Sequence, residues 1–148
     1  MSDRPDRPTP VPGTEPALSE FVTLPGWDPF EDLVGPMFES EASTPKRSCA
    51  MRLEARHCNT ARIAHGGLLM TFADYATFAI AREAIGPNGG VTVSMTNDFT
   101  AAARAGDLLE ADVDITRETR SMVFVQGRLR VEDTVVMAFS AVVKKLRG

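Results

Sequence analysis

The segment from His65 to Glu83 holds the residue types best suited to chemistry. It opens with His-Gly-Gly and continues as an apolar run in which Asp74 is the only residue charged at pH 7 before Arg82. A carboxylate in the middle of an apolar helix costs free energy unless another group pairs with it. Carboxylates in enzymes transfer protons or attack electrophilic carbon. Asp74 is therefore the first candidate for a catalytic residue.

The element that positions Asp74 is predicted to be an α-helix from Gly66 to about Ile85. Its composition is that of a helix buried nearly all round, which requires a sheet curled about it. The sequence GPNGG over residues 86–90 ends the helix, because glycine and proline do not continue it. A helix of twenty residues is about 30 Å long, more than one such sheet covers. We expect a second subunit to bury its remaining side.

Six strands are predicted around this helix, over residues 37–43, 47–55, 91–99, 107–117, 121–131 and 134–144. Apolar and polar residues alternate most clearly in two of these strands. The apolar face of the strand over 107–117 holds Leu109, Ala111, Val113 and Ile115, and that of the strand over 47–55 holds Cys49, Met51, Leu53 and Ala55. The connections at 118–120 and 132–133 are short enough for antiparallel hairpins. This order of elements predicts an α+β domain with a long central helix wrapped by a curved antiparallel sheet of five to six strands.

Residues 1–27 are predicted to form a flexible, proline-rich arm before a single domain over residues 28–148. The first sixteen residues contain five prolines and few large apolar side chains, too little burial to offset the entropy of ordering them. Asp28-Pro29 has the form of a helix N-cap followed by proline at the first helical position. A short helix is therefore expected from Pro29 to about Val34, ended by Gly35-Pro36.

Composition narrows the class of protein. The 148 residues, 43% of them hydrophobic, fit one globular domain. A net charge of −4 argues against a nucleic-acid partner, which requires clustered Lys and Arg. No signal sequence or run of eighteen charge-free apolar residues is present, so we expect no membrane partner and a cytoplasmic location. Cys49 and Cys58 are expected to be reduced thiols, with Cys49 in the core.

The chain also carries a recognisable motif. The segment from His57 to Gly67 reads HCNTARIAHGG, and Asp74 follows nine residues after His65. This arrangement resembles the signature of the hot-dog-fold acyl-CoA thioesterases, and most of all the phenylacetate-pathway (PaaI-like) branch and its mammalian relatives. The likeness extends over residues 37–146, including VTVSM at 91–95 and FTAAARAGD at 99–107.

Two positions depart from that family's pattern. Arg62 stands where the family usually has glycine, and a non-glycine residue would cost roughly 1 kcal/mol there if the backbone needs a positive φ. Ala102 replaces a frequent proline.

The resemblance implies a helix wrapped in an antiparallel sheet, dimers that often pair into tetramers, and hydrolysis of a coenzyme A thioester without a metal or redox cofactor. By position, it assigns Asp74 as nucleophile or general base and Gly66 as an oxyanion N–H donor. Asn59 would be a polar contact near the thioester, and Thr92 a hydroxyl that orients water. The substrate-binding candidates are His57, His65, Gly67 and Arg120.

Helix geometry adds a requirement of its own. Thioester hydrolysis builds negative charge on the carbonyl oxygen, and the free N–H groups of a helix's first turn can stabilise it. Asp74 lies eight residues beyond Gly66, about 12 Å along the axis at 1.5 Å per residue, of which a leaning side chain recovers only about 2 to 3 Å. If both groups act, Gly66 and Asn59 must come from one subunit and Asp74 and Thr92 from the other. A symmetric dimer then has two equivalent sites at its interface.

Other interpretations stay open. The same fold hosts hydratases or dehydratases of enoyl and hydroxyacyl thioesters, although those use a histidine close to a carboxylate and here the carboxylate is on the third helical turn. A non-catalytic module that binds acyl-CoA is another possibility, although Asp74 has no obvious duty in it. Asp74 could also bond only a neighbouring backbone group or an arginine. His57, Cys58 and His65 lack the spacing of a metal site, so no zinc is expected.

Overall fold

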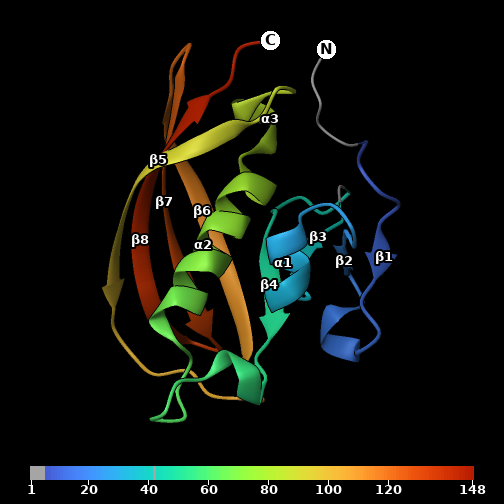
Figure 1. Ribbon diagram of the computed structural model, residues 1–148, viewed down its shortest axis with the longest axis vertical. Coiled ribbons are helices and arrows are strands. Elements are labelled where there is room, and N and C mark those ends of the chain that lie inside the picture. Colours follow the sequence, from blue (N-terminus) through green and yellow to red (C-terminus); the bar gives the residue numbers. More distant parts are fainter. Residues whose placement is uncertain (1–5, 42) are drawn as a thin grey trace.

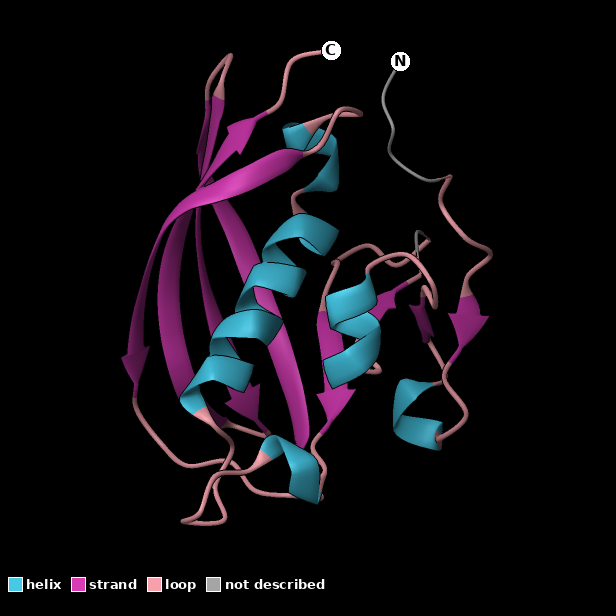
Figure 2. Cartoon of the chain, in the orientation of Figure 1, coloured by secondary structure: helices cyan, strands magenta, loops and turns pink. Residues whose placement is uncertain are grey.

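The computed structural model describes residues 6–41 and 43–148; the first five residues of the predicted arm, and residue 42 of the strand predicted over 37–43, lie outside the described residues. One antiparallel sheet curves around one long helix (Figure 1, Figure 2). The strands are β1 (Val11–Pro12), β2 (Phe21–Thr23), β3 (Phe38–Ser40), β4 (Cys49–Arg52), β5 (Gly90–Phe99), β6 (Leu108–Glu118), β7 (Met122–Val131) and β8 (Thr134–Lys145). The α-helices are α1 (Pro29–Val34), α2 (Gly66–Ile80) and α3 (Arg82–Ile85), with 3-10 turns η1 (Pro16–Leu18) and η2 (Ala55–His57).

The strand order is β1-β2-β3-β4-β6-β7-β8-β5, with every neighbouring pair antiparallel. The predicted hairpins β6–β7 and β7–β8 are confirmed, and the four C-terminal strands begin and end within one residue of their predicted limits. Strand β5 returns to pair with β8, which leaves β5 at one edge of the sheet. The backbone of that edge is available to another chain.

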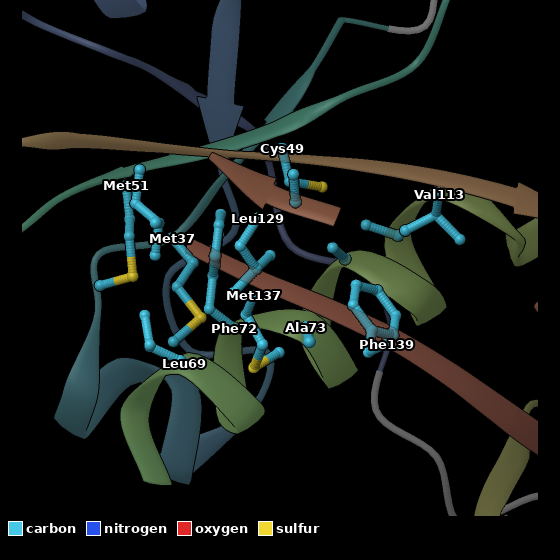
Figure 3. Packing of buried hydrophobic residues seen from close by; sticks show 14 of the residues in the cluster. Met37, Cys49, Met51, Leu69, Phe72, Ala73, Val113, Leu129, Met137 and Phe139 are labelled. Atoms are coloured by element: carbon cyan, nitrogen blue, oxygen red, sulfur yellow. The ribbon is translucent and has the colours of Figure 1, made fainter. Parts of the chain in front are cut away.

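The core lies between α2 and the concave face of the sheet. Leu69, Phe72 and Ala73 of α2 gather with Leu129 of β7 and Met137 of β8 in one cluster (Figure 3). All five side chains are buried, which explains why the helix is so apolar. Cys49 is buried in the same cluster as a free thiol, as predicted.

The long helix differs from its prediction in two ways. It is interrupted at Ala81, whose φ of −87° and ψ of 13° separate α2 from α3. It is also not covered all round by its own chain, because Met70 is 40% exposed and Asp74 only partly buried. Its end at Gly86 is confirmed, where φ is +91°.

The prediction of five to six strands was wrong, because the sheet has eight strands within the described part of the chain. The added strands β1 and β2 lie inside the segment expected to be a flexible arm and extend the sheet beyond β3. Between them, Leu18 packs with Phe38 and Ala50 on the other face of the sheet. Strand β4 is therefore covered on both faces. It is also shorter than predicted, so Ala55 is exposed in η2 rather than buried.

The predicted short helix is confirmed as α1. The carboxylate of Asp28 accepts hydrogen bonds from the backbone N–H groups of Phe30 and Glu31 at 2.9 and 3.1 Å. Proline at the first helical position needs no such partner. Helix α1 lies beside α2 in the fold (Figure 1). None of the helices in the described part of the chain is long and apolar enough to span a membrane.

Candidate active site

Asp74 has a partner on the neighbouring strand. The hydroxyl of Thr92 on β5 donates a hydrogen bond to Asp74 Oδ1 at 2.6 Å. Burial raises the pKa of Asp74 above its usual range, whereas this hydrogen bond, which favours the charged form, opposes the rise. The structure thus brings together two of the four predicted catalytic residues. It also excludes the interpretation in which Asp74 only bonds a neighbouring backbone group or an arginine.

Asp74 and Thr92 line a surface cavity of about 420 Å³. Besides Asp74, α2 contributes Gly67 to the lining, and further lining residues come from α1 and β5. The remaining lining residues are Asp28, Phe30, Glu31, Met70, Thr71, Tyr75 and Met95. Apolar walls with a few polar groups are typical of a site for an organic substrate.

The N-terminus of α2 offers one free amide. His65 is the N-cap residue, and its ring Nδ1 accepts the N–H of Gly67 at 2.9 Å. The N–H of Gly67 is therefore already used, whereas no group in the described residues accepts the N–H of Gly66. Gly66 remains the candidate oxyanion donor. His65 acts as a cap that leaves its Nε2 free to contact a substrate.

Asp74 and the free amide are far apart within one chain. Helix α2 is unbroken from Gly66 to Ile80, so the eight residues that separate Gly66 from Asp74 span about 12 Å along its axis. The chain therefore contains both predicted halves of the site, Asp74 with Thr92 and the amide of Gly66, but within one chain they are too far apart to act on the same carbonyl group.

The loop before α2 is held by Asn59. Its side-chain oxygen accepts the N–H groups of Ala61 and Ile63 at 2.9 and 3.4 Å. The predicted contact between Asn59 and the thioester is thus limited to its amide nitrogen. Arg62 in this loop has a φ of +59°, so the backbone keeps the conformation for which glycine is suited and bears a strain of about 1 kcal/mol.

Two predicted substrate-binding residues lie away from the cavity. Both ring nitrogens of buried His57 are used, Nδ1 accepting the N–H of Glu54 at 2.9 Å and Nε2 donating to Val34 O at 2.7 Å. His57 therefore anchors the end of α1 and has no nitrogen left for a substrate. Arg120 is in the β6–β7 hairpin, at the opposite end of the sheet from Gly66 (Figure 1).

Sequence reasoning missed Glu31 of α1. It lines the cavity that contains Asp74, and burial together with the carboxylates of Asp28 and Asp74 raises its pKa to about 7. The signal in the sequence was indirect: α1 is predicted correctly, but nothing in its pattern shows that Glu31 faces α2.

The raised pKa of Glu31 predicts a pH-dependent stability. Between pH 4.5 and about 7, Glu31 is mostly protonated in the folded state and mostly ionised in the unfolded state. Glu31 therefore favours the folded state at low pH, and this contribution disappears as the pH rises through that range. We expect Glu31→Gln to raise the free energy of unfolding by about 1 to 3 kcal/mol at pH 8 relative to wild type, and by much less at pH 5. Urea unfolding of both proteins at the two pH values measures this difference.

The exposed Glu83 on α3 provides the matched control. Glu83→Gln removes the same charge from a solvated side chain and should shift stability little at either pH. An equal effect of Glu31→Gln at pH 5 and pH 8 would contradict the assignment of Glu31 as a partly protonated group.

Comparison with known proteins places these features in a family. The thioesterase superfamily matches residues 61–138, the stretch that carries Gly66, Asp74 and Thr92. A Pseudomonas aeruginosa protein named "Putative esterase PA0474" is 36% identical over 115 residues, which cover 77% of this chain and 86% of that protein.

Solved structures agree with the sequence comparison. A mutant of the phenylacetic acid degradation protein PaaI from Thermus thermophilus is 28% identical with a TM-score of 0.69, over 80% of this chain and 100% of that one. The E. coli PaaI protein, from the phenylacetic acid degradation operon, is 25% identical with a TM-score of 0.63, over 69% and 73% of the two chains.

Proposed function

The chain belongs to the thioesterase superfamily, with the hot-dog fold and in the PaaI-like branch, and from that premise we propose that it is an acyl-CoA thioesterase. It would hydrolyse an aryl or medium-length acyl thioester to the free acid and coenzyme A. The observation that carries this proposal is the pair formed by Asp74 and Thr92 in a cavity at the middle of the central helix. The PaaI relatives belong to phenylacetic acid degradation, which favours an arylacetyl group.

Asp74 would drive the attack on the thioester carbonyl. In one route, its carboxylate oxygen adds to the carbonyl carbon and coenzyme A leaves as the thiolate, which gives an anhydride that water then hydrolyses. In the other route, Asp74 removes a proton from a water molecule that attacks the carbonyl carbon. In both routes the carbonyl oxygen gains negative charge, which the N–H of Gly66 would stabilise. Thr92 would hold the reactive oxygen of Asp74, or the water, in position. No step requires a metal or redox cofactor.

The complete site would lie between two subunits, because Gly66 and Asp74 are too far apart in one chain. The edge strand β5 exposes Val91 and Val93, and α2 exposes Met70 next to the cavity. A second copy that covers this edge and this face of α2 would bury all three apolar side chains. It would also bring its own Gly66 and His65 toward Asp74, in a homodimer or in a tetramer made of two such dimers.

A thiol-release assay tests the activity. With phenylacetyl-CoA and medium-chain acyl-CoA esters, free coenzyme A should appear at a rate that depends on enzyme concentration. With an enoyl-CoA ester, loss of the double bond without thiol release would instead favour a hydratase. Binding of acyl-CoA without any thiol release would favour the non-catalytic module.

A further inference from the structure

Phe99 at the end of β5 lies beside the start of α2. A Cβ built on Gly66 would be 3.3 Å from Cζ and 3.4 Å from Cε1 of its ring, so the tip of the ring faces the residue that offers the free amide. The ring is nevertheless 53% exposed in one chain. Single exposed apolar side chains are common on protein surfaces, but the position of this one is tied to that of the candidate oxyanion donor.

Two exposed apolar side chains belong to the other half of the site. Phe30 of α1 is 56% exposed and Met70 of α2 is 40% exposed, and both line the cavity that holds Asp74. All six residues of α1 are described, and none of them is buried. The ring of Phe30 therefore adds little to the core of its own chain. Its burial requires a group from outside.

The directions of β5 and α2 relate these two apolar groups. Thr92 near the start of β5 bonds Asp74, whereas Phe99 at its end lies beside Gly66, eight residues earlier on α2. The strand and the helix thus run in opposite directions (Figure 1). An assembly that brings Gly66 of one chain to Asp74 of another must also bring the ring of Phe99 to the cavity of that second chain.

The thioester sets how close these groups come. Its carbonyl oxygen accepts an N–H at about 2.9 Å, and the attacking oxygen starts about 3 to 3.5 Å from the carbonyl carbon. The nitrogen of Gly66 and the carboxylate of the partner's Asp74 then lie within about 7 Å of each other. At that separation the ring of Phe99 reaches the mouth of the cavity. Two-fold symmetry repeats the arrangement at the second site.

On the premise of the proposed function and of its shared site, we infer that Phe99 is a positioning residue: its ring packs on Phe30 and Met70 of the partner and closes the cavity over the thioester. The contact removes three apolar side chains from water. It also keeps bulk water away from the carbonyl group under attack. The hydrogen bond from the amide to the developing oxyanion is stronger in such a closed site than in water.

Cross-linking tests the contact independently of turnover. All chains carry Cys58→Ser, which removes the partly exposed native thiol and leaves the buried Cys49. One chain carries Phe30→Cys and the other Phe99→Cys, with different tags, and the co-expressed pair is treated with a short bismaleimide. We expect a cross-linked product that contains both tags. Val11→Cys replaces Phe99→Cys in the control. Val11 is exposed on β1, at the opposite edge of the sheet from β5, and should give little product.

Kinetics test the role of the ring in the reaction. At protein concentrations at which the assembly is complete, Phe99→Ala should lower kcat/KM for thiol release by about 10-fold or more, because the thioester is held less precisely. Phe99→Leu keeps apolar bulk and should stay within about 3-fold of wild type. In a Phe30→Ala background, the further loss caused by Phe99→Ala should shrink to about 2-fold, because its partner ring is already absent. Val11→Ala should leave kcat/KM unchanged.

Absence of the mixed product, or an equal yield with Val11→Cys, would overturn the inference. Additive losses in the double variant, or wild-type kcat/KM in Phe99→Ala, would overturn it as well. If wild type releases thiol but the two rings do not meet, the assignment of Phe99 is wrong and the thioesterase activity stands. If wild type hydrolyses no thioester, the proposed function is wrong, and the cross-link still decides whether Phe99 contacts the partner's Phe30.

Discussion

Asp74→Asn should lower kcat for thioester hydrolysis by about 10²- to 10⁴-fold, the contribution of a positioned acid-base group. Asparagine has the same shape and can still accept the hydrogen bond from Thr92. It cannot take a proton from water, and it is a poor nucleophile. Because burial already disfavours the charged form of Asp74, the neutral side chain should leave the fold intact. Initial rates of free-thiol release at saturating substrate measure the effect.

Asp133→Asn is the matched control for that experiment. Asp133 is an exposed carboxylate in the β7–β8 turn, remote from the cavity, and its loss should change the rate by less than 2-fold. Circular dichroism and sedimentation should show the same folded assembly for both variants and wild type. A turnover rate in Asp74→Asn close to that of wild type would refute the catalytic role of Asp74.

Gly66→Pro should lower kcat by about 10²- to 10³-fold, the loss expected when one oxyanion donor is removed. Gly66 is the first residue of α2, a position where proline is tolerated because its N–H has no partner inside the helix. His65 before it has a φ of −64° and a ψ of 135°, the extended conformation that a following proline requires. The substitution therefore removes one N–H group without breaking a hydrogen bond inside the helix.

Gly66→Ala separates loss of the N–H from added bulk. A Cβ at this position would lie 3.3 Å from Cζ of Phe99, a close contact that the half-exposed ring can relieve. Alanine adds that Cβ and keeps the N–H, so its kcat should stay within about 5-fold of wild type, whereas proline removes the N–H. Equal losses of activity in the two variants would show that crowding against Phe99, and not the amide, explains the effect of proline.

The parts of the fold that sequence predicts well are those with strong local patterns. Strands β6 to β8 alternate over ten or more residues, and Asp28-Pro29 marks the start of α1, so both were predicted correctly. Strands β1 and β2 span two and three residues and include Pro12. Such short segments have no period to detect, and they become strands only because β3 offers an edge to pair with.

The residues of the candidate site also differ in how well the sequence predicts them. Asp74, Gly66 and Thr92 were assigned from the spacing of the motif and from the family resemblance, and the structure pairs Asp74 with Thr92. His57 was predicted as a substrate contact, although both its nitrogens hold the protein's own backbone. Glu31 and Tyr75 are 44 positions apart in the chain. They line the same cavity because the fold brings α1 close to α2, an arrangement that no local pattern in the sequence predicts.

The shared site between two subunits is tested most directly by combining the two inactive variants. Asp74→Asn and Gly66→Pro chains are co-expressed with different tags, and the mixture is assayed for thiol release. In each mixed dimer, one site would receive Asp74 from the Gly66→Pro chain and the amide of Gly66 from the Asp74→Asn chain. Random pairing should then restore about a quarter of the wild-type activity. If both groups acted from the same chain, every site would lack one of them, and the mixture would stay as inactive as its parents.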